Sequence, residues 1–321
     1  MDRQSSVEIE VRGLRKSFDK LLAVSDLSFT ASTGQIFGLV GPDGAGKSTT
    51  IRMLAGILPP DAGEIRVARY DVVTDPESVK SVISYMPQRF GLYEDLTVDE
   101  NIRFYADLYG VARQQREQRA EQLLKACAMD QFRRRLAGKL SGGMKQKLGL
   151  ICALIHTPRV LLLDEPTTGV DPVSRREFWA ILYALLDQGV TILVSTSYLD
   201  EAERCHRLAL LYQGRLLICD RPESLRARMT RAVLSVVSPE ATRIKRLLAG
   251  VAGISNAIVV GDSVHVFVDD ILLRQSKIQP LLDTTGIPYT AIEQVSPTIE
   301  DFFVDALARR GYQGWQTSSD Q

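Results

Sequence analysis

The residues with the clearest chemical potential form a glycine-rich segment, Gly41–Ser48, which fits the pattern G-x-x-x-x-G-K-[ST]. An apolar strand is expected before it and a helix over Ser48–Leu58 after it, which is the context of a phosphate-binding loop. In such a loop, backbone N–H groups face the phosphates at the positive end of the helix. Lys47 then reaches the β- and γ-phosphates, Ser48 gives its hydroxyl to Mg²⁺, and Thr49 assists at the α-phosphate. The residues predicted to bind the nucleotide here are Gly41, Asp43, Gly44, Ala45, Gly46, Lys47, Ser48 and Thr49.

A second candidate is the acidic pair Asp164 and Glu165, which follows the wholly apolar run Val160–Leu163. Such a run is typical of a strand buried on both faces of a parallel sheet. Because successive side chains along a strand point to opposite sides, one carboxylate can approach Mg²⁺ and the other the attacking water. We assign Asp164 to the metal and Glu165 to the general base. By itself the pair could equally cap the next helix, but a phosphate loop in the same chain favours catalysis.

Between these two elements lies Leu140–Gln146, with the sequence L-S-G-G-M-K-Q. With this segment the chain resembles the nucleotide-binding domains of ATP-binding cassette (ABC) proteins, whose signature is L-S-G-G-x-x-Q. Ser141 and Gly143 offer a hydroxyl and a bare backbone N–H at a helix N-terminus, which again suits an anion. In the family this loop serves the ATP held by the opposite protomer. The resemblance therefore implies a head-to-tail pair of cassettes with two ATP molecules between them.

Further residues take their roles from this resemblance, which covers about residues 6–228. Phe18 matches the aromatic residue that stacks on adenine, and a core phenylalanine is the alternative. Gln88 matches the glutamine that senses Mg²⁺ and the γ-phosphate, and Arg89–Asn101 the region that docks a membrane subunit. Asp171 belongs to a loop that crosses to the other protomer.

The branch that the chain resembles most is that of drug-resistance exporters. The similar segments are Gly91–Thr97, Tyr198–Glu203 and Ser296–Phe303. The resemblance implies an ATPase that drives a separate integral membrane subunit, peripheral on the cytoplasmic face of the cell membrane. The other readings are an ABC ATPase outside transport, acting on ribosomes or DNA, and a regulatory module that binds ATP with little hydrolysis.

The sequence departs from the family after the predicted strand Thr191–Ser195. The family places a histidine there that contacts the γ-phosphate, and this chain has Ser197. Serine is shorter and carries no positive charge, so we expect slower hydrolysis at the site built on Lys47 and Glu165. Two arrangements fit: an asymmetric pair in which Ser141 and Gly143 complete a more active partner site, or a homodimer with two slow sites. The partner cassette would be a separate subunit or the second half of a tandem protein.

Composition limits the other possibilities. The 321 residues carry 39 basic and 39 acidic side chains, and a net charge of zero argues against a nucleic-acid partner. No apolar run approaches the roughly 18–20 residues that span a bilayer, and the N-terminus is not a secretory signal. The four cysteines show no C-x-x-C spacing, which predicts a reducing, cytosolic compartment.

Alternating strands and helices predict an α/β fold in residues 1–230: a P-loop NTPase of the ABC type, with a helical subdomain over about 90–158. The predicted strands are Val7–Leu14, Leu27–Thr30, Gln35–Val40, Val160–Leu163, Thr191–Ser195 and Leu208–Tyr212.

Residues 231–310 predict a small α+β domain in the β-α-β-β-α-β order of ferredoxin-like folds, closed by a helix. Its predicted elements are Ala232–Val237, Glu240–Leu248, Ala257–Val260, Val264–Val268, Asp270–Leu282, Tyr289–Val295 and Pro297–Arg309. A structural or dimerising role is the expectation for this domain, with a ligand sensor or a brace for the membrane subunit as alternatives. A flexible tail is expected over 311–321.

Overall fold

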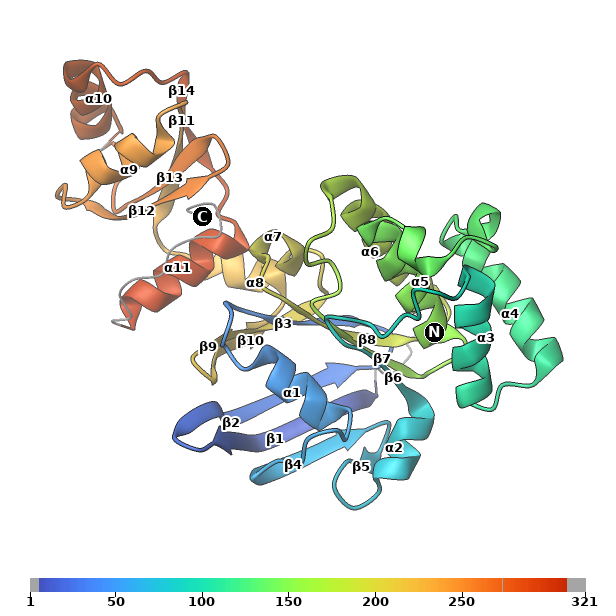
Figure 1. The fold of residues 1–321 in the computed structure, drawn as a ribbon. Coiled ribbons are helices and arrows are strands. Elements are labelled where there is room, and N and C mark those ends of the chain that lie inside the picture. Colours follow the sequence, from blue (N-terminus) through green and yellow to red (C-terminus); the bar gives the residue numbers. More distant parts are fainter. Residues whose placement is uncertain (1–5, 273, 311–321) are drawn as a thin grey trace, which may run out of the picture. The chain divides into compact units, whose positions relative to one another are not determined.

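The structure is a computed structural model that describes residues 6–272 and 274–310 (Figure 1). These residues form two compact units. The first contains the chain up to Ser197 together with Cys205–Cys219, and the second contains Tyr198–Arg204 and the chain from Asp220 onward. The predicted domain division at residue 230 stays a prediction, and the predicted tail at 311–321 lies outside the described residues.

The first unit is built on a six-stranded sheet in the order β10-β9-β3-β8-β7-β6 (Figure 1). The pairs β6–β7, β7–β8, β8–β3 and β3–β9 are all parallel. Every residue of β3, β7 and β8 is buried, as expected for parallel strands covered on both faces. Because parallel strands end at one edge, the loops after β3, β7 and β8 meet there. The strands are β3 (Ile36–Val40), β6 (Ile83–Met86), β7 (Val160–Asp164), β8 (Thr191–Thr196), β9 (Arg207–Tyr212) and β10 (Arg215–Asp220).

A second, antiparallel sheet in the order β2-β1-β4-β5 packs in the same unit. Its strands are β1 (Val7–Phe18), β2 (Leu21–Ser32), β4 (Ala62–Val67) and β5 (Tyr70–Asp71). Helix α1 (Lys47–Leu54) lies between the two sheets, and its Ile51 belongs to one apolar core with residues of both (Figure 1). Phe29 of β2 stacks on Phe37 of β3 with ring centroids 4.9 Å apart. The phosphate loop is therefore held between two packed sheets.

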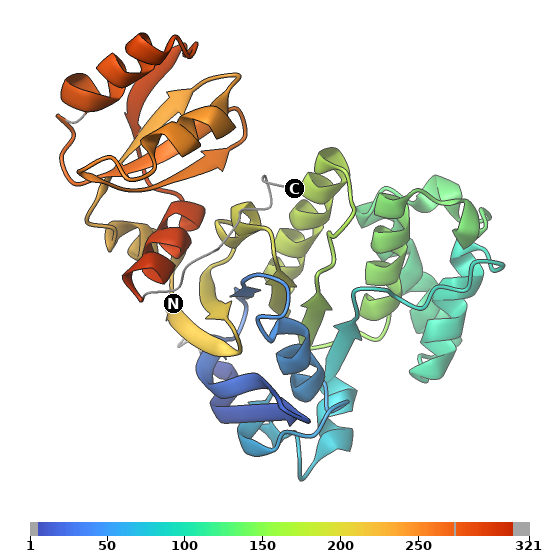
Figure 2. The ribbon, with the colours of Figure 1, turned by 60° about the vertical axis from the view of Figure 1, so that its left-hand side comes forward.

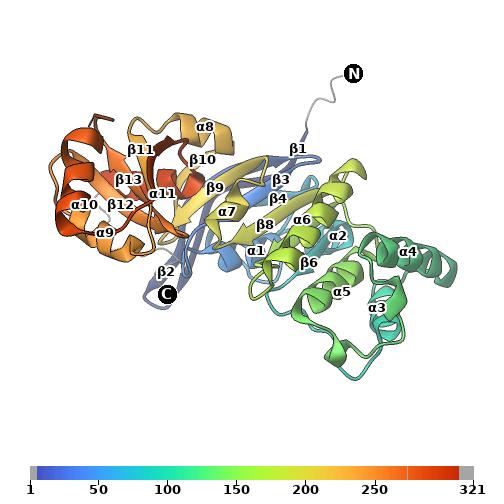
Figure 3. The same ribbon diagram turned by 90° about the horizontal axis from the view of Figure 1, so that it is seen from above.

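The middle of the chain is helical, as predicted, and α3, α4 and α5 gather beside the sheet (Figure 3). Thr97 and Glu100 form a capping box at the start of α3, which fixes where that helix begins. None of the described helices is both long and apolar enough to cross a bilayer. The remaining helices of the first unit are α2 (Pro76–Val82), α3 (Val98–Leu108), α4 (Arg113–Ala126), η1 (Asp130–Phe132), η2 (Ala137–Lys139), α5 (Gly142–Leu154) and α6 (Pro172–Asp187).

The second unit contains an antiparallel sheet in the order β12-β13-β11-β14. Helices α9 and α10 cover one face, and residues of both helices share an apolar core with Leu234 and Val236 of β11 (Figure 2). Val233 of the same strand points the other way and packs with Val304 of α11. The elements are α7 (Leu199–Ala202), α8 (Pro222–Ala227), β11 (Ala232–Val237), α9 (Ala241–Leu248), β12 (Ile254–Val260), β13 (Ser263–Val268), η3 (Arg274–Ile278), α10 (Gln279–Thr285), β14 (Ala291–Val295) and α11 (Ile299–Arg309).

All predicted strands are present, and the second unit follows the predicted β-α-β-β-α-β order, but two helices differ from their predicted bounds. The helix expected over Ser48–Leu58 ends at Leu54, because the chain turns at Gly56 with φ 67°. The helix expected over Asp270–Leu282 is a π-helical turn followed by α10. Pro280 explains the break: it has no N–H to donate and sits in the first turn of α10.

Candidate functional site

The last glycine of the phosphate loop, Gly46, has a backbone conformation that only glycine accommodates there. Gly46 caps α1 in the left-handed conformation with φ 97°, and a Cβ there would lie 2.5 Å from the carbonyl oxygen of Ala23. The next residue, Lys47, begins the helix, and its Nζ curls back to donate to the carbonyls of Gly41 (2.7 Å) and Pro42 (2.9 Å). The lysine is therefore held inside the loop with its charge at the helix N-terminus.

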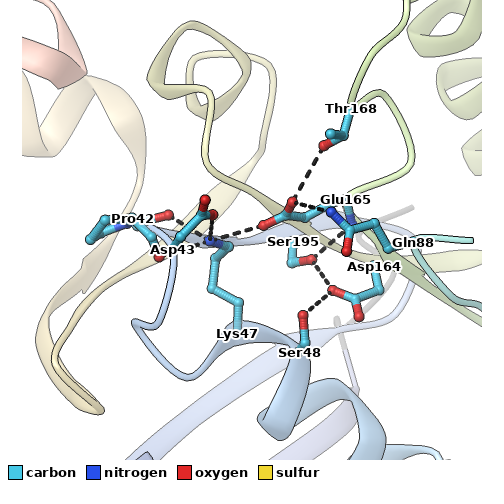
Figure 4. A network of polar contacts seen from close by, with 10 residues as sticks. Pro42, Asp43, Lys47, Ser48, Gln88, Asp164, Glu165, Thr168 and Ser195 are labelled. Atoms are coloured by element: carbon cyan, nitrogen blue, oxygen red, sulfur yellow. Dashed lines mark hydrogen bonds and ion pairs between the residues drawn. The ribbon is translucent and has the colours of Figure 1, made fainter. Parts of the chain in front are cut away.

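A buried ion pair joins this lysine to the acid after β7 (Figure 4). Lys47 Nζ lies 3.0 Å from Glu165 Oε1, and the two side chains are 3% and 8% exposed. The other carboxylate oxygen of Glu165 accepts hydrogen bonds from Gln88 Nε2 (3.1 Å) and Thr168 Oγ1 (3.3 Å). Glu165 thus contacts two other residues that the sequence analysis assigned to the site, Lys47 and Gln88.

The second carboxylate faces the predicted metal ligand. Ser48 Oγ donates to Asp164 Oδ1 at 2.8 Å, and Ser195 Oγ donates to the same oxygen at 2.7 Å (Figure 4). Burial first, and then the negative charge of Asp164, raise the pKa of Tyr85. The two carboxylates therefore occupy different surroundings, as the strand alternation predicted.

Of these residues, Lys47, Ser48, Gln88 and Glu165 line a pocket of about 820 Å³ at the end of the parallel sheet, and the predicted metal ligand Asp164 is buried behind Ser48. Phe18 stands at its wall with 44% of its surface exposed, so it is not a core phenylalanine. The lining residues are Phe18, Leu21, Leu22, Ala23, Asp43, Gly44, Ala45, Gly46, Lys47, Ser48, Thr49, Gln88, Glu165 and Gln213. The structure thus brings together an exposed aromatic ring, the phosphate loop and the catalytic candidates.

The predicted signature segment begins α5. Ser141 caps this helix and accepts a hydrogen bond from the backbone N–H of Met144. Ser141 is exposed, but Gly143, the other residue predicted to face the ATP of a partner, is buried, and the exposed glycine is Gly142. None of the three belongs to the residues that line the pocket of this chain. Asp171 caps α6, and hydrogen bonds from Ser174, first from its hydroxyl and then from its N–H, hold the pKa of Asp171 below its usual range.

The two signature glycines differ in the space around them, which gives a stability test. A Cβ on Gly143 would lie 2.5 Å from Ser174 Oγ and 2.6 Å from its Cβ, whereas one on Gly142 would meet nothing closer than 3.9 Å. We expect Gly143→Ala to destabilise the chain by about 1–3 kcal/mol. That loss corresponds to a fall in Tm of roughly 2–4 °C per kcal/mol in differential scanning fluorimetry. Gly142→Ala is the matched control, and equal Tm values for the two variants would contradict the expectation.

Two observations were not foreseen. Ser197 follows β8, is partly buried and, unlike the other predicted catalytic residues, is not among the described residues that line the pocket. Ser195, two residues earlier, bonds Asp164 and was not singled out from the sequence. The signal for Ser195 was a serine that directly follows the apolar run Ile192–Val194.

The residues that face the pocket fit ATP with Mg²⁺. Gly44 leaves open space in the loop, since a Cβ there would meet nothing within 4 Å, and Ser48 and Asp164 offer two hard oxygen ligands side by side. No group of three or more His, Cys, Asp or Glu side chains suited to a metal occurs among the described residues. The two oxygen ligands of Ser48 and Asp164 suit a Mg²⁺ ion, which takes its other ligands from phosphates and water.

The parallel sheet, the glycine loop at a helix N-terminus and the paired carboxylates define a P-loop nucleotide-binding domain. The family model "ABC transporter" matches residues 24–168. The daunorubicin/doxorubicin resistance ATP-binding protein DrrA of Streptomyces peucetius is 38% identical over 259 residues, which are 79% of this chain and 78% of that protein. The Nod factor export ATP-binding protein I of Burkholderia thailandensis is 36% identical over 268 residues, 83% of this chain and 88% of that protein. The chain therefore belongs to the ATP-binding proteins of the ABC transporter family.

A longer relative and two solved structures extend this comparison. The probable multidrug ABC transporter ATP-binding protein YbhF of Escherichia coli (strain K12) is 44% identical over 307 residues, 94% of this chain. The chain spans about half, 52%, of the length of that relative. A solved ATP-binding subunit of an ABC transporter, 31% identical, matches 69% of this chain and 92% of its own with a TM-score of 0.63. A nucleotide-free ATP-binding cassette at 22% identity, with a TM-score of 0.61 over 69% of this chain and 94% of its own, shares the fold.

Proposed function

We propose that this chain hydrolyses ATP with Mg²⁺ and uses the reaction to drive a separate membrane subunit, as half of a head-to-tail pair of cassettes. The observation that carries the proposal is the cluster at the end of the parallel sheet, in which Lys47, Gln88 and Glu165 meet in one pocket beside Ser48. Its side chains supply a phosphate-binding cation, a metal ligand and a general base within hydrogen-bond reach of one another.

Each residue has one task in this proposal. Lys47 turns its ammonium to the β- and γ-phosphates, which it reaches from the helix N-terminus. Ser48 and Asp164 hold Mg²⁺, which neutralises developing charge on the phosphates when it is bound. Glu165 accepts a proton from the attacking water, and Gln88 orients that carboxylate through its 3.1 Å hydrogen bond. Phe18 supplies an exposed ring for the adenine.

The pairing of cassettes rests on the exposed signature segment. Ser141 and Gly142 lie at a helix N-terminus, open to solvent and outside the pocket of their own chain. Such a terminus suits the phosphates of an ATP held by another cassette. Asp171 would lie in the loop that reaches the same partner. The partner is a second cassette, in a separate chain or in the same polypeptide.

We further propose that the pair is asymmetric. Ser197 replaces the histidine of the family, and a serine hydroxyl carries no positive charge toward the γ-phosphate. The slow ATP hydrolysis that we expect at the site of Lys47 and Glu165 fits a chain that completes the more active site of its partner. The intact signature segment Ser141–Gly143 fits the same arrangement. A regulatory module with little hydrolysis is the second candidate, and Ser197 is the observation that favours it.

The experiment that tests this proposal compares phosphate release by the purified chain with that of Ser197→His. We expect the histidine variant to be faster by about 10- to 100-fold, because it adds one donor to the transferred phosphoryl group. Ser197→Ala serves as a control without gain, and Ser197→His combined with Glu165→Gln should gain nothing. Equal and substantial rates for wild type and Ser197→His would favour a homodimer with two working sites. No phosphate release from any variant would favour the regulatory module.

The names of the relatives guide the proposal for cargo. They are described as multidrug, daunorubicin/doxorubicin resistance and Nod factor export proteins. We propose export, with this chain peripheral on the cytoplasmic face of the cell membrane. Arg89–Asn101, which leads into α3, would dock the membrane subunit. Co-purification with an integral membrane protein tests this placement.

A further inference from the structure

One buried serine contacts both acidic residues of the site, the carboxylate of Asp164 and the backbone of Glu165. Ser195, in β8, is 0% exposed. Its hydroxyl donates to Asp164 Oδ1 at 2.7 Å and accepts from the backbone N–H of Glu165 at 2.9 Å (Figure 4). One hydroxyl proton and one lone pair serve these two bonds, so a single side chain touches both acids at once.

The sheet register brings this serine to Asp164. In the parallel pair β7–β8, Asp164 and Ser195 are register partners, so their side chains stand on the same face. Asp164 Oδ1 also accepts from Ser48. Ser48 lies at the pocket and is the proposed metal ligand, whereas Ser195 is buried in the sheet and does not line the pocket. Ser195 is thus the fixed donor that sets the orientation of the carboxylate.

The second hydrogen bond holds a strained turn. Glu165 leaves β7 with φ 48°, a left-handed conformation that a non-glycine residue keeps only when its surroundings hold it. The hydrogen bond from the Glu165 N–H to Ser195 Oγ ties the backbone of this turn to β8. The backbone turn that presents Glu165 therefore depends on the same serine, while Lys47, Gln88 and Thr168 hold the carboxylate itself.

We infer that Ser195 is a positioning residue of this site, which orients Asp164 for Mg²⁺ and fixes the turn that presents Glu165. The inference rests on the proposed function. Removal of a partner that orients a metal ligand commonly weakens metal binding about 10- to 100-fold. The effect should therefore appear in metal affinity as well as in turnover.

The test measures Mn²⁺ binding by electron paramagnetic resonance in the full chain saturated with ATP, and ATP binding alone in EDTA. We expect Ser195→Ala to raise the half-saturating Mn²⁺ concentration at least about tenfold and to leave ATP binding in EDTA unchanged. Ser195→Thr, which keeps the hydroxyl, should stay within about threefold of wild type, clearly below the tenfold loss expected for alanine. Ser84→Ala, which removes a buried hydroxyl from strand β6 of the same sheet, should change neither value.

The outcomes separate the two proposals. A Ser195→Ala variant with wild-type Mn²⁺ affinity overturns the inference and leaves the proposed function standing. A wild-type chain that binds no Mn²⁺ with ATP overturns the proposed function and the inference with it. If alanine prevents folding, Ser195→Cys takes its place, since a thiol keeps the volume but donates weakly, and the same loss is expected.

Discussion

Replacing Glu165 with glutamine is expected to slow ATP hydrolysis by this chain about 10²- to 10⁴-fold while ATP binding is retained. The amide has the shape of the carboxylate but cannot accept a proton from water. Its contacts can persist, because Lys47 keeps the carbonyls of Gly41 and Pro42 and an amide oxygen still accepts hydrogen bonds. Single-turnover phosphate release measures the chemical step, and a fluorescent ATP analogue measures binding.

The control for this experiment is Thr168→Val. The hydroxyl of Thr168 donates to Glu165 at 3.3 Å and has no role in the proposed reaction, so its removal should change the rate of hydrolysis little. A Glu165→Gln chain that hydrolyses ATP at more than half the wild-type rate would contradict the assignment of the base. In the assembled transporter the same variant separates the two pairing models. Activity that survives there, and disappears when the glutamate of the partner cassette is disabled, supports an asymmetric pair.

The sequence predicted the residues of the site wherever their geometry is local. Gly46 and Lys47 are neighbours in one loop, and the conformation of that loop follows from the residue types themselves. Ser195 was not predicted because its contact is not local in the sequence. Its contact with Asp164 arises from the pairing of two strands whose partners are 31 residues apart, and no short pattern encodes that register.

Two of the three exporter-like segments, Tyr198–Glu203 and Ser296–Phe303, gain a structural explanation that the sequence alone did not provide. Thr298 and Asp301 of Ser296–Phe303 form a capping box that begins α11, and the same Asp301 accepts from His265 Nδ1 at 2.9 Å. Glu203 of the other segment accepts from the backbone N–H of Ile299, again at the start of α11. Sequence similarity marked both segments as typical of exporters. In the structure they meet at one helix N-terminus of the second unit, where carboxylates are favoured.

Removing the lysine of the buried ion pair should have the largest effect on stability. In the chain without nucleotide, Lys47→Met leaves the 8%-exposed Glu165 carboxylate without its cation. Such a loss commonly destabilises a protein by about 3–5 kcal/mol. Glu165→Gln should cost less, because Lys47 keeps two carbonyl acceptors. Urea unfolding measures the free energy of unfolding of each variant.

The double variant Lys47→Met with Glu165→Gln distinguishes an ion pair from two independent effects. We expect it to be more stable than the sum of the single losses predicts, with a coupling energy above about 1 kcal/mol, because no charge is then left buried. The exposed pair Lys80–Glu77, with side chains 52% and 81% exposed, is the control. The same pair of substitutions there should give a coupling energy of about 0.3–0.5 kcal/mol, the usual value for an exposed ion pair one helical turn apart.

Additive losses at Lys47 and Glu165 would mean that the pair contributes nothing of its own. A clear coupling has a consequence for the reaction, because one lysine then serves two anions in turn. When Lys47 turns to the phosphates of ATP, Glu165 loses its cation and keeps the hydrogen bonds from Gln88 and Thr168. A carboxylate without an adjacent cation is the stronger base. ATP binding and activation of Glu165 would then be one event, set by the 3.0 Å contact between the two side chains.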